Sequence, residues 1–298
     1  MAAQQITEFS LSGVYTALVT PFTRDASAVD YRSLEKLIEL QLAAGVQGVV
    51  VCGSTGEAST LTQQEYGEVI SFVRERTKGS LSCVAGISTS STMAAIEMAK
   101  LIKGIGCDAI LVAAPPYNRP TQEGLLEHFR AIAQAVRIPL IAYNIPGRSA
   151  VGFTAATLAT LSREGLIAGI KESSGSIDLL ADIIRAVSPI CQVVSGDDSL
   201  LLAVLAYGGS GAISASANVL PREFVELTAA YAAGRIDDAR KLQLGMLSKI
   251  RALFIESNPV PVKTVLALHG VIAEPTVRLP LVPLSAASLA TLSAEFLL

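Results

Sequence analysis

The sequence alternates short apolar runs with longer amphipathic runs, and this alternation repeats about eight times. An apolar run without alternating polar positions is typical of a strand that is buried on both faces, as in a parallel sheet. The intervening runs have the periodicity of helices that cover such a sheet. The predicted strands are 14–19, 48–52, 82–85, 109–113, 139–143, 167–170, 192–195 and 211–214; the predicted helices are 30–44, one opening at 62–65, 91–105, 122–135, 154–162, 177–187, 198–207 and one opening at Pro221.

Eight strand–helix units over about 235 residues match a (β/α)₈ TIM barrel in number and length. The alternative is an open, doubly wound α/β sheet, but no G-x-G-x-x-G motif follows the first strand to support a dinucleotide fold. Strand signals stop after Gly234, and the segments 236–255, 259–269 and 285–296 have helical patterns. We therefore predict a barrel domain over 1–234 and a C-terminal helical segment over 235–298.

Composition narrows the class of protein. Hydrophobic residues make up 51% of the chain and charged residues 16%, with a net charge of -3 and no tryptophan. The absence of a basic block argues against nucleic acid or an anionic membrane as partner. The N-terminus lacks signal-peptide regions, and apolar runs are too short to span a bilayer. We expect a soluble, cytoplasmic protein.

Cysteine and histidine usage argues against a metal centre. The four cysteines are scattered through apolar runs without C-x-x-C spacing, as expected of buried free thiols in a reducing compartment. The two histidines, His128 and His269, lie far apart on predicted helices. We therefore expect a site without a metal.

Candidate site residues are sought at the carboxyl ends of the strands, where barrel enzymes build their active sites. Lys171 ends the sixth apolar run and is followed by a polar turn. An ammonium at the rim of an apolar barrel loses hydration, which disfavours its charged form. This is the setting of a Schiff-base nucleophile. The structural alternative is a strand-end lysine whose ammonium reaches water.

Other strand ends carry polar groups suited to binding or proton transfer. Ser54 and Thr55 lie in a Gly-Ser-Thr-Gly loop whose hydroxyls and backbone N–H groups can hold a carboxylate or phosphate. Tyr143 offers a phenol for proton transfer, and Arg148 a guanidinium for bidentate carboxylate binding. Tyr117 lies in a stiff, Pro-bracketed loop. Each also has a structural reading: helix capping, core packing or surface exposure.

Further strand-end residues complete this set. Gly196 and Ile213, on the seventh and eighth strands, are candidate substrate-binding residues. Glu172, Asp197 and Asp198 are interpreted as structural or helix-capping carboxylates.

Taken together, these motifs resemble the pyruvate-dependent class I aldolase and lyase superfamily of dihydrodipicolinate synthase and N-acetylneuraminate lyase. The similarity extends from Tyr15–Phe22 to Asn258–Lys263. Its most specific segments are Gly-Ser-Thr-Gly-Glu at 53–57, Tyr-Asn-Ile-Pro-Gly-Arg at 143–148 and Gly-Ile-Lys-Glu-Ser at 169–173. Within the superfamily, the second segment is similar to the dihydrodipicolinate synthase branch.

The resemblance implies a reaction without external cofactor. Lys171 forms an imine with pyruvate, whose carboxylate Thr55 holds. The derived enamine adds to aspartate semialdehyde, whose carboxylate rests on Arg148. Tyr143, Ser54 and Tyr117 form a proton relay, with Tyr117 reaching into the site of a second copy. The family suggests a homotetramer, a dimer of tight dimers, acting in lysine and diaminopimelate biosynthesis.

Two departures from the family pattern stand out. Ser54 stands where the family more often has threonine. Serine keeps the hydroxyl group, but it lacks the methyl group that restricts the side-chain rotamer. Positions matching the inhibitor site of lysine-sensitive members are Gln63, Tyr66, Ser90 and Ala94, and Pro116 replaces a tyrosine. Feedback inhibition by lysine is therefore expected to be weak or absent.

Two competing functions remain at this stage. A keto-deoxy-sugar acid aldolase or dehydratase would share Lys171 and Tyr143 without requiring Arg148. A non-catalytic metabolite-binding barrel would form no covalent adduct with pyruvate.

Overall fold

The computed structural model describes residues 9–296. Its eight strands close into a barrel in chain order, from β1 to β8. Strand β1 pairs with β2 in parallel, and so does each strand from β3 to β7 with the strand that follows it. The predicted TIM barrel is therefore confirmed. The chain divides into two compact units: a middle unit of residues 9–13 and 83–213, and a flanking unit of 14–82 and 214–296. The predicted boundary between 234 and 235 stays a prediction.

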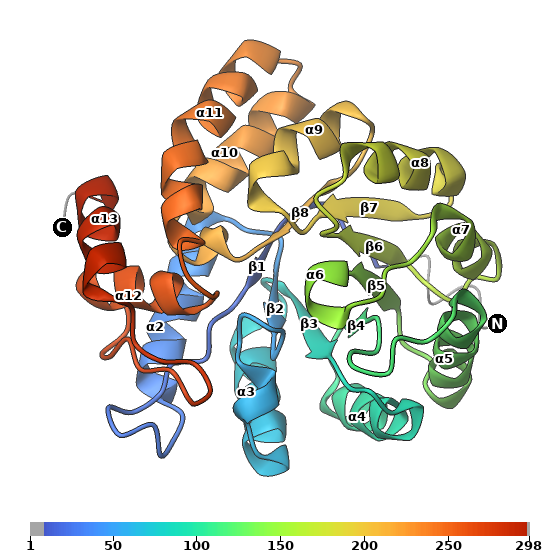
Figure 1. The fold of residues 1–298 in the computed structure, drawn as a ribbon, viewed down its shortest axis with the longest axis horizontal. Helices are drawn as coiled ribbons and strands as arrows, with labels where there is room; N and C mark the ends of the chain where they lie inside the picture. Colours follow the sequence, from blue (N-terminus) through green and yellow to red (C-terminus); the bar gives the residue numbers. More distant parts are fainter. Residues whose placement is uncertain (1–8, 297–298) are drawn as a thin grey trace. The chain divides into compact units, whose positions relative to one another are not determined.

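The middle unit contains the strands from β3 onward and their helices. Figure 1 shows α4, α5, α7 and α8 on the outer side of strands β3 to β6. β4 and β5 are buried along their whole length, as expected for strands covered on both faces. The elements are β3 (Ser82–Ile87), α4 (Thr92–Ile105), β4 (Ala109–Ala113), α5 (Gln122–Ala135), β5 (Leu140–Asn144), α6 (Pro146–Ser149), α7 (Ala155–Arg163), β6 (Gly169–Glu172), α8 (Ile177–Val187), β7 (Gln192–Ser195), η2 (Asp198–Leu200), α9 (Leu201–Ala206) and β8 (Gly211–Ser214).

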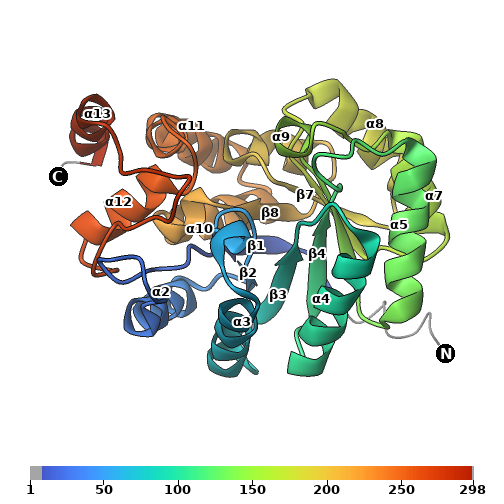
Figure 2. The same cartoon turned by 60° about the horizontal axis from the view of Figure 1, so that its bottom comes forward.

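The flanking unit holds the first two strands and the C-terminal helices. In Figure 2, α11, α12 and α13 lie together, in agreement with their mutual contacts. The elements are β1 (Gly13–Ala17), α2 (Tyr31–Ala44), β2 (Gly48–Val51), η1 (Ala58–Thr60), α3 (Gln63–Thr77), η3 (Ser216–Asn218), α10 (Pro221–Ala232), α11 (Ile236–Leu253), α12 (Val260–Leu268) and α13 (Ala286–Phe296).

Side-chain caps mark the starts of six α-helices, namely α2, α3, α4, α5, α7 and α8. Thr62 and Glu65 form the predicted capping box of α3, in which each side chain accepts from the backbone N–H of the other residue. Ser91, Thr121 and Thr154 cap α4, α5 and α7 in a similar way, each hydroxyl accepting from a backbone N–H three residues later. Only the Thr62–Glu65 capping box is among the sequence predictions.

The other predicted elements lie within a few residues of the observed ones, and two differences lie near the predicted site residues. Helix α6 occupies the Pro-Gly-Arg turn, where no helix is predicted, and it spans a single turn. The sixth strand runs through Glu172 instead of ending at Ile170, because Lys171 and Glu172 pair in register with β5 and β7. All four cysteines are buried and free, as predicted. Within residues 9–296, no helix is long and apolar enough to cross a membrane.

Candidate active site

Lys171 lies inside strand β6 and is only 6% exposed. Lysine is rarely buried to this extent unless its ammonium is paired with a carboxylate. Among the described residues, no carboxylate forms an ion pair with Lys171; its recorded contact is with the ring of Tyr143, 4.2 Å from Nζ to the ring centroid. The side chain is therefore a buried amine whose nearest partner is a phenol ring.

Tyr143 reaches this lysine from the neighbouring strand β5. The register places Tyr143 directly beside Lys171, and paired residues of parallel strands point to the same side of the sheet. Tyr143 is 8% exposed. The structure thus brings together the amine and one of the phenols that the sequence predicts, near the carboxyl ends of two adjacent strands.

Gly196 provides the surface on which the lysine side chain rests. A Cβ atom at this position would lie 2.7 Å from Cε and 2.9 Å from Cγ of Lys171, and closer still to the Ser173 hydroxyl. Real Cβ atoms do not approach other atoms so closely, so a larger residue here would have to displace the Lys171 and Ser173 side chains. The structure thus places Gly196 against the Lys171 side chain, and its role in substrate binding stays a prediction.

A buried amide–carboxylate pair fixes the residues next to Lys171 and Tyr143. Asn144 Nδ2 donates to Glu172 Oε2 at 2.7 Å, across the β5–β6 register. The other oxygen of Glu172 accepts from the backbone N–H of Ser174, and Asn144 Oδ1 accepts from the N–H of Phe153. Glu172 is therefore structural, as interpreted from the sequence, and it holds the turn that follows the lysine.

The other predicted residues of the middle unit occupy different settings. Arg148 is exposed on the one-turn helix α6, where the Ser149 hydroxyl donates to the carbonyls of Ile145 and Val151. Tyr117 is 91% exposed with φ of 71°, and no ring contact joins it to another described residue. Ile213 is fully buried in β8, whose register with β7 places Ala212 beside Ser195.

In the flanking unit, the 53–57 loop presents several hydrogen-bond donors. The backbone N–H groups of Gly56 and Glu57 donate within the loop, to Gly53 and Ser54. In residues 9–296, no acceptor is recorded for the N–H groups of Ser54 and Thr55. Ser54 is half-buried and Thr55 is 4% exposed. Such unengaged donors suit an anionic group, as the sequence indicated.

A cluster of buried and partly buried charged residues holds Glu57, the last residue of this loop. Glu57 Oε1 accepts from Lys263 Nζ at 2.6 Å, with both side chains almost fully buried. Glu57 Oε2 accepts from the backbone N–H of Arg278, whose guanidinium binds both carboxylate oxygens of Glu65. The Phe22 ring contacts both cations, with its centroid 4.2 Å from Lys263 Nζ and 4.3 Å from Arg278 Cζ.

Lys263 is a second buried lysine, but its setting differs from that of Lys171. Burial lowers the pKa of Lys263 to about 8, and the Glu57 carboxylate opposes this shift. Its side chain is 0% exposed and salt-bridged. A keto acid has no access to an amine held in this way, so Lys263 is structural.

The sequence interpretation did not assign roles to Asn258, Lys263 or Glu57. Asn258 Nδ2 donates to Thr55 Oγ1 at 2.9 Å, and the two residues are 203 positions apart. The one available signal was the Asn-Pro-Val-Pro-Val-Lys segment, 258–263, which carries both Asn258 and Lys263. Its contacts could not be read from spacing.

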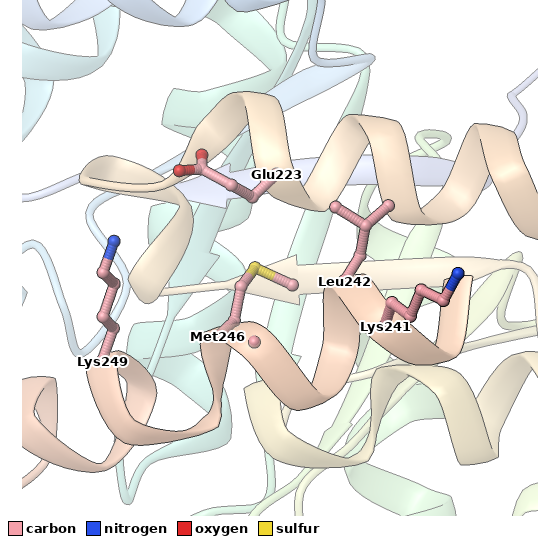
Figure 3. A pocket seen from close by; sticks show the side chains of 6 residues that line it. Glu223, Lys241, Leu242, Met246 and Lys249 are labelled. Atoms are coloured by element: carbon pink, nitrogen blue, oxygen red, sulfur yellow. The ribbon is translucent and has the colours of Figure 1, made fainter. Parts of the chain in front are cut away.

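A surface cavity of about 260 Å³ between α10 and α11 contains none of the predicted site residues. Figure 3 shows Lys241, Met246 and Lys249 on one helix and Glu223 on the other. Two lysines and one glutamate around an apolar floor provide no nucleophile near a general base. We assign no catalytic role to this cavity.

Known proteins resemble the chain over nearly its whole length. The model of the dihydrodipicolinate synthetase family matches residues 10–296. A 4-hydroxy-tetrahydrodipicolinate synthase of Pelobacter propionicus is 45% identical over 95% of this chain and 96% of its own length. The corresponding protein of Endomicrobium trichonymphae is 44% identical over 91% of this chain and 92% of its own length.

Solved structures agree with these sequence matches. The 4-hydroxy-tetrahydrodipicolinate synthase of Methylacidiphilum fumariolicum SolV superposes with a TM-score of 0.93 at 37% identity, covering 96% of this chain and 95% of that one. The dihydrodipicolinate synthase of Aquifex aeolicus gives a TM-score of 0.92 at 39% identity, with 95% and 96% covered. The fold, the order of the motifs and these matches agree: the chain belongs to the dihydrodipicolinate synthetase family.

Proposed function

We propose that the protein is a Schiff-base-forming lyase that condenses pyruvate with L-aspartate 4-semialdehyde to 4-hydroxy-tetrahydrodipicolinate, in lysine and diaminopimelate biosynthesis. The observation that carries this proposal is the buried amine of Lys171 against the Tyr143 ring, without an ion pair among the described residues. Relatives at 42–45% identity over most of the chain carry the name of this synthase.

The reaction begins at the lysine amine. Unprotonated Nζ of Lys171 attacks the keto carbon of pyruvate, a C–N bond forms, and loss of water leaves an imine. The protonated imine withdraws electrons from the methyl carbon, which loses a proton and becomes the nucleophilic carbon of an enamine. No external cofactor is needed in this scheme, because the iminium is the electron sink.

The second half of the reaction forms the ring. The enamine carbon adds to the aldehyde carbon of aspartate semialdehyde, forming a C–C bond and a hydroxyl group. The amine of the semialdehyde then attacks the imine carbon, and the C–N bond to Lys171 breaks. The freed lysine amine returns to its starting state.

The remaining site residues take the roles that the family resemblance implies. Thr55 holds the carboxylate of pyruvate together with the N–H groups of its loop, and Arg148 holds the carboxylate of the semialdehyde. Tyr143, Ser54 and Tyr117 pass protons between the reacting atoms and solvent. Gly196 and Ile213 line the substrate. The unengaged donors of the 53–57 loop support the first of these assignments.

Assembly and location extend this proposal. Tyr117 is 91% exposed, which leaves it available for insertion into the site of a second copy. The homotetramer, a dimer of tight dimers, is the assembly that the family resemblance implies. Four buried free cysteines support a reducing compartment, and we place the enzyme in the cytoplasm.

Borohydride trapping tests the covalent step. Incubation with pyruvate and borohydride should add one reduced pyruvate adduct per chain, and peptide mapping should locate it on Lys171. Lys263 is the internal control, since it is buried and salt-bridged. An adduct on Lys263 instead, or none at all, would contradict the proposal.

The second substrate is tested separately. A coupled assay with pyruvate and aspartate semialdehyde, run beside a panel of sugar-derived aldehydes, should favour the semialdehyde. Arg148→Ala should weaken semialdehyde turnover by roughly 100-fold, because a charge-assisted bidentate contact is lost, while adduct formation with pyruvate persists. Equal turnover of sugar-derived aldehydes by both proteins would favour a keto-deoxy-sugar acid aldolase.

The response to lysine depends on the residues at the positions that match the inhibitor site of lysine-sensitive relatives. Tyr66 is buried, and Gln63, Ser90 and Ala94 are exposed, at the positions that match the inhibitor site of lysine-sensitive relatives. We propose that millimolar lysine leaves turnover nearly unchanged in the coupled assay. Strong suppression by lysine would contradict this expectation.

A further inference from the structure

Asn258 lies just before helix α12, in the C-terminal part of the chain, yet its amide reaches the 53–57 loop. The residue is 8% exposed, and its Nδ2 donates to the Thr55 hydroxyl oxygen at 2.9 Å. Thr55 itself is 4% exposed. A buried hydrogen bond between these side chains fixes the rotamer of the threonine.

The direction of this bond determines what the hydroxyl group can do. A hydroxyl has one proton to donate and two lone pairs to accept with. Because Asn258 occupies a lone pair, the proton of Thr55 stays available, and residues 9–296 contain no recorded acceptor for it. The hydroxyl is thereby held as a donor, which is the polarity that a carboxylate requires.

Helix α12 anchors the other end of the same loop. Lys263, one turn into the helix, donates to Glu57 Oε1 at 2.6 Å. The segment from Asn258 to Lys263 therefore contacts both Thr55 and Glu57. Between them, Gly56 has backbone atoms of Leu18 and Cys52 at 3.2 Å from where a Cβ would lie. The Thr20 hydroxyl donates to the Gly56 carbonyl at 2.7 Å. These contacts hold the 53–57 loop in one conformation, in which the N–H groups of Ser54 and Thr55 stay available to a ligand.

We propose that Asn258 is a positioning residue for keto-acid binding: its amide holds the Thr55 hydroxyl so that the proton points to the carboxylate of pyruvate. The inference rests on the proposed function and deepens it, since it gives the segment before α12 a role in substrate affinity. Asn258 acts through Thr55 and touches no reacting atom.

The test compares substitutions that remove or invert this hydrogen bond. Asn258→Ala removes the donor and should raise the KM for pyruvate about tenfold, with a smaller change in kcat. Asn258→Asp should raise it further, because a carboxylate accepts the Thr55 proton and repels the substrate anion. Asn258→Ser, which is smaller and polar, replaces the alanine variant if that protein does not fold.

A double-mutant cycle separates positioning from general damage. Thr55→Val should raise the KM for pyruvate at least as much as Asn258→Ala, and Asn258→Ala should add almost nothing in the Thr55→Val background. The matched control is Thr264→Val. Thr264 is buried on α12, and its hydroxyl donates to the Val260 carbonyl. This substitution should leave the KM for pyruvate unchanged.

Three outcomes would overturn the inference. The first is an unchanged KM for pyruvate in folded Asn258→Ala protein, and the second is an additive effect in the cycle. In both, borohydride trapping on Lys171 still succeeds in the wild type, so the proposed function stands. The third, absence of any pyruvate adduct in the wild type, removes the proposed function and the inference with it.

Discussion

At Gly196, the missing side chain is what leaves space for Lys171. The lysine stem lies over the glycine backbone, and the Ser173 hydroxyl approaches the same point. A nucleophile must be held close to its productive geometry, because misplacement by about 1 Å can cost roughly 100-fold in rate. Gly196 contributes to this geometry by leaving room for the lysine side chain, although it has no side chain of its own.

Gly196→Ala should therefore reduce both trapping on Lys171 and kcat by roughly 100-fold, because the added methyl group displaces the lysine side chain. Trapping with pyruvate, quantified by intact mass, measures the first effect and the coupled assay the second. The control is Gly104→Ala in α4, where an added Cβ meets nothing within 4 Å. Wild-type trapping by the Gly196 variant would contradict the steric argument.

His128 is a buried residue whose effect is on stability. It is 4% exposed on α5, with Nδ1 2.9 Å from the Thr92 hydroxyl of α4, and burial lowers its pKa to about 4. Below its ordinary value of 6.5, the unfolded chain binds a proton that the folded chain does not. Stability should therefore fall between about pH 6.5 and pH 4, by at most about 3 kcal/mol.

Urea unfolding at pH 7 and pH 5 measures this effect. His128→Gln should show a smaller loss between the two pH values than the wild type. His269→Gln, at an exposed position, is the matched control and should keep the wild-type loss. Equal losses in all three proteins would rule out His128 as the source.

At the scale of elements, the start of α3 is bound to the chain segment before α13. The capping-box residue Glu65 accepts two bonds from Arg278, at 2.8 and 2.6 Å, in addition to its bond with Thr62. The Arg278 hydrogen bonds lower the pKa of Glu65 to about 2. One carboxylate thus serves both the helix cap and a contact between distant elements.

Glu65→Gln should lower the free energy of unfolding at pH 7 by about 2 kcal/mol, because a partly buried, bidentate pair is lost. Since folding lowers the pKa of Glu65 from 4.5 to about 2, the contribution is complete above pH 4.5 and disappears as pH falls toward 2. Urea titrations at pH 7 and pH 3 should show the two proteins converging. Glu97→Gln, in an exposed pair, should change little at either pH.

At the scale of the whole molecule, Tyr117 is 91% exposed within its own chain, although we propose that its phenol belongs to the proton relay. Its loop holds Tyr117 and Arg119 at positive φ, and Asn118 Nδ2 donates to the Ser90 carbonyl. A constrained loop that projects an aromatic side chain is consistent with insertion into a second copy. The proposed relay is then complete only in the oligomer.

Complementation between a weakly active variant and an inactive one tests this arrangement. Tyr117→Phe should lower kcat by about 10- to 100-fold, because the relay loses a hydroxyl. Mixing it with inactive Lys171→Ala should restore up to about a quarter of wild-type activity, since half of randomly paired dimers hold one intact site. A mixture no more active than its components would show that Tyr117 acts within its own chain or not at all.

Local patterns determined most of the architecture of this protein. Continuous apolar strands, amphipathic helices and Ser/Thr caps are properties of neighbouring residues, so the eight units and their order could be read from the chain. The position of Lys171 near the end of the sixth strand was also predictable, because a charged residue after an apolar run is a local feature. The family motifs added the reaction, which no periodicity determines.

Tertiary structure alone decided which distant residues support the site. Asn258 and Thr55 are 203 positions apart, and Lys263 and Glu57 are 206 apart. Hydrogen bonds and ion pairs between such positions depend on how strands and helices pack, and no local pattern encodes them. The contact between Gly196 and Lys171 likewise depends on the pairing of strands β6 and β7, which exists only in the folded barrel.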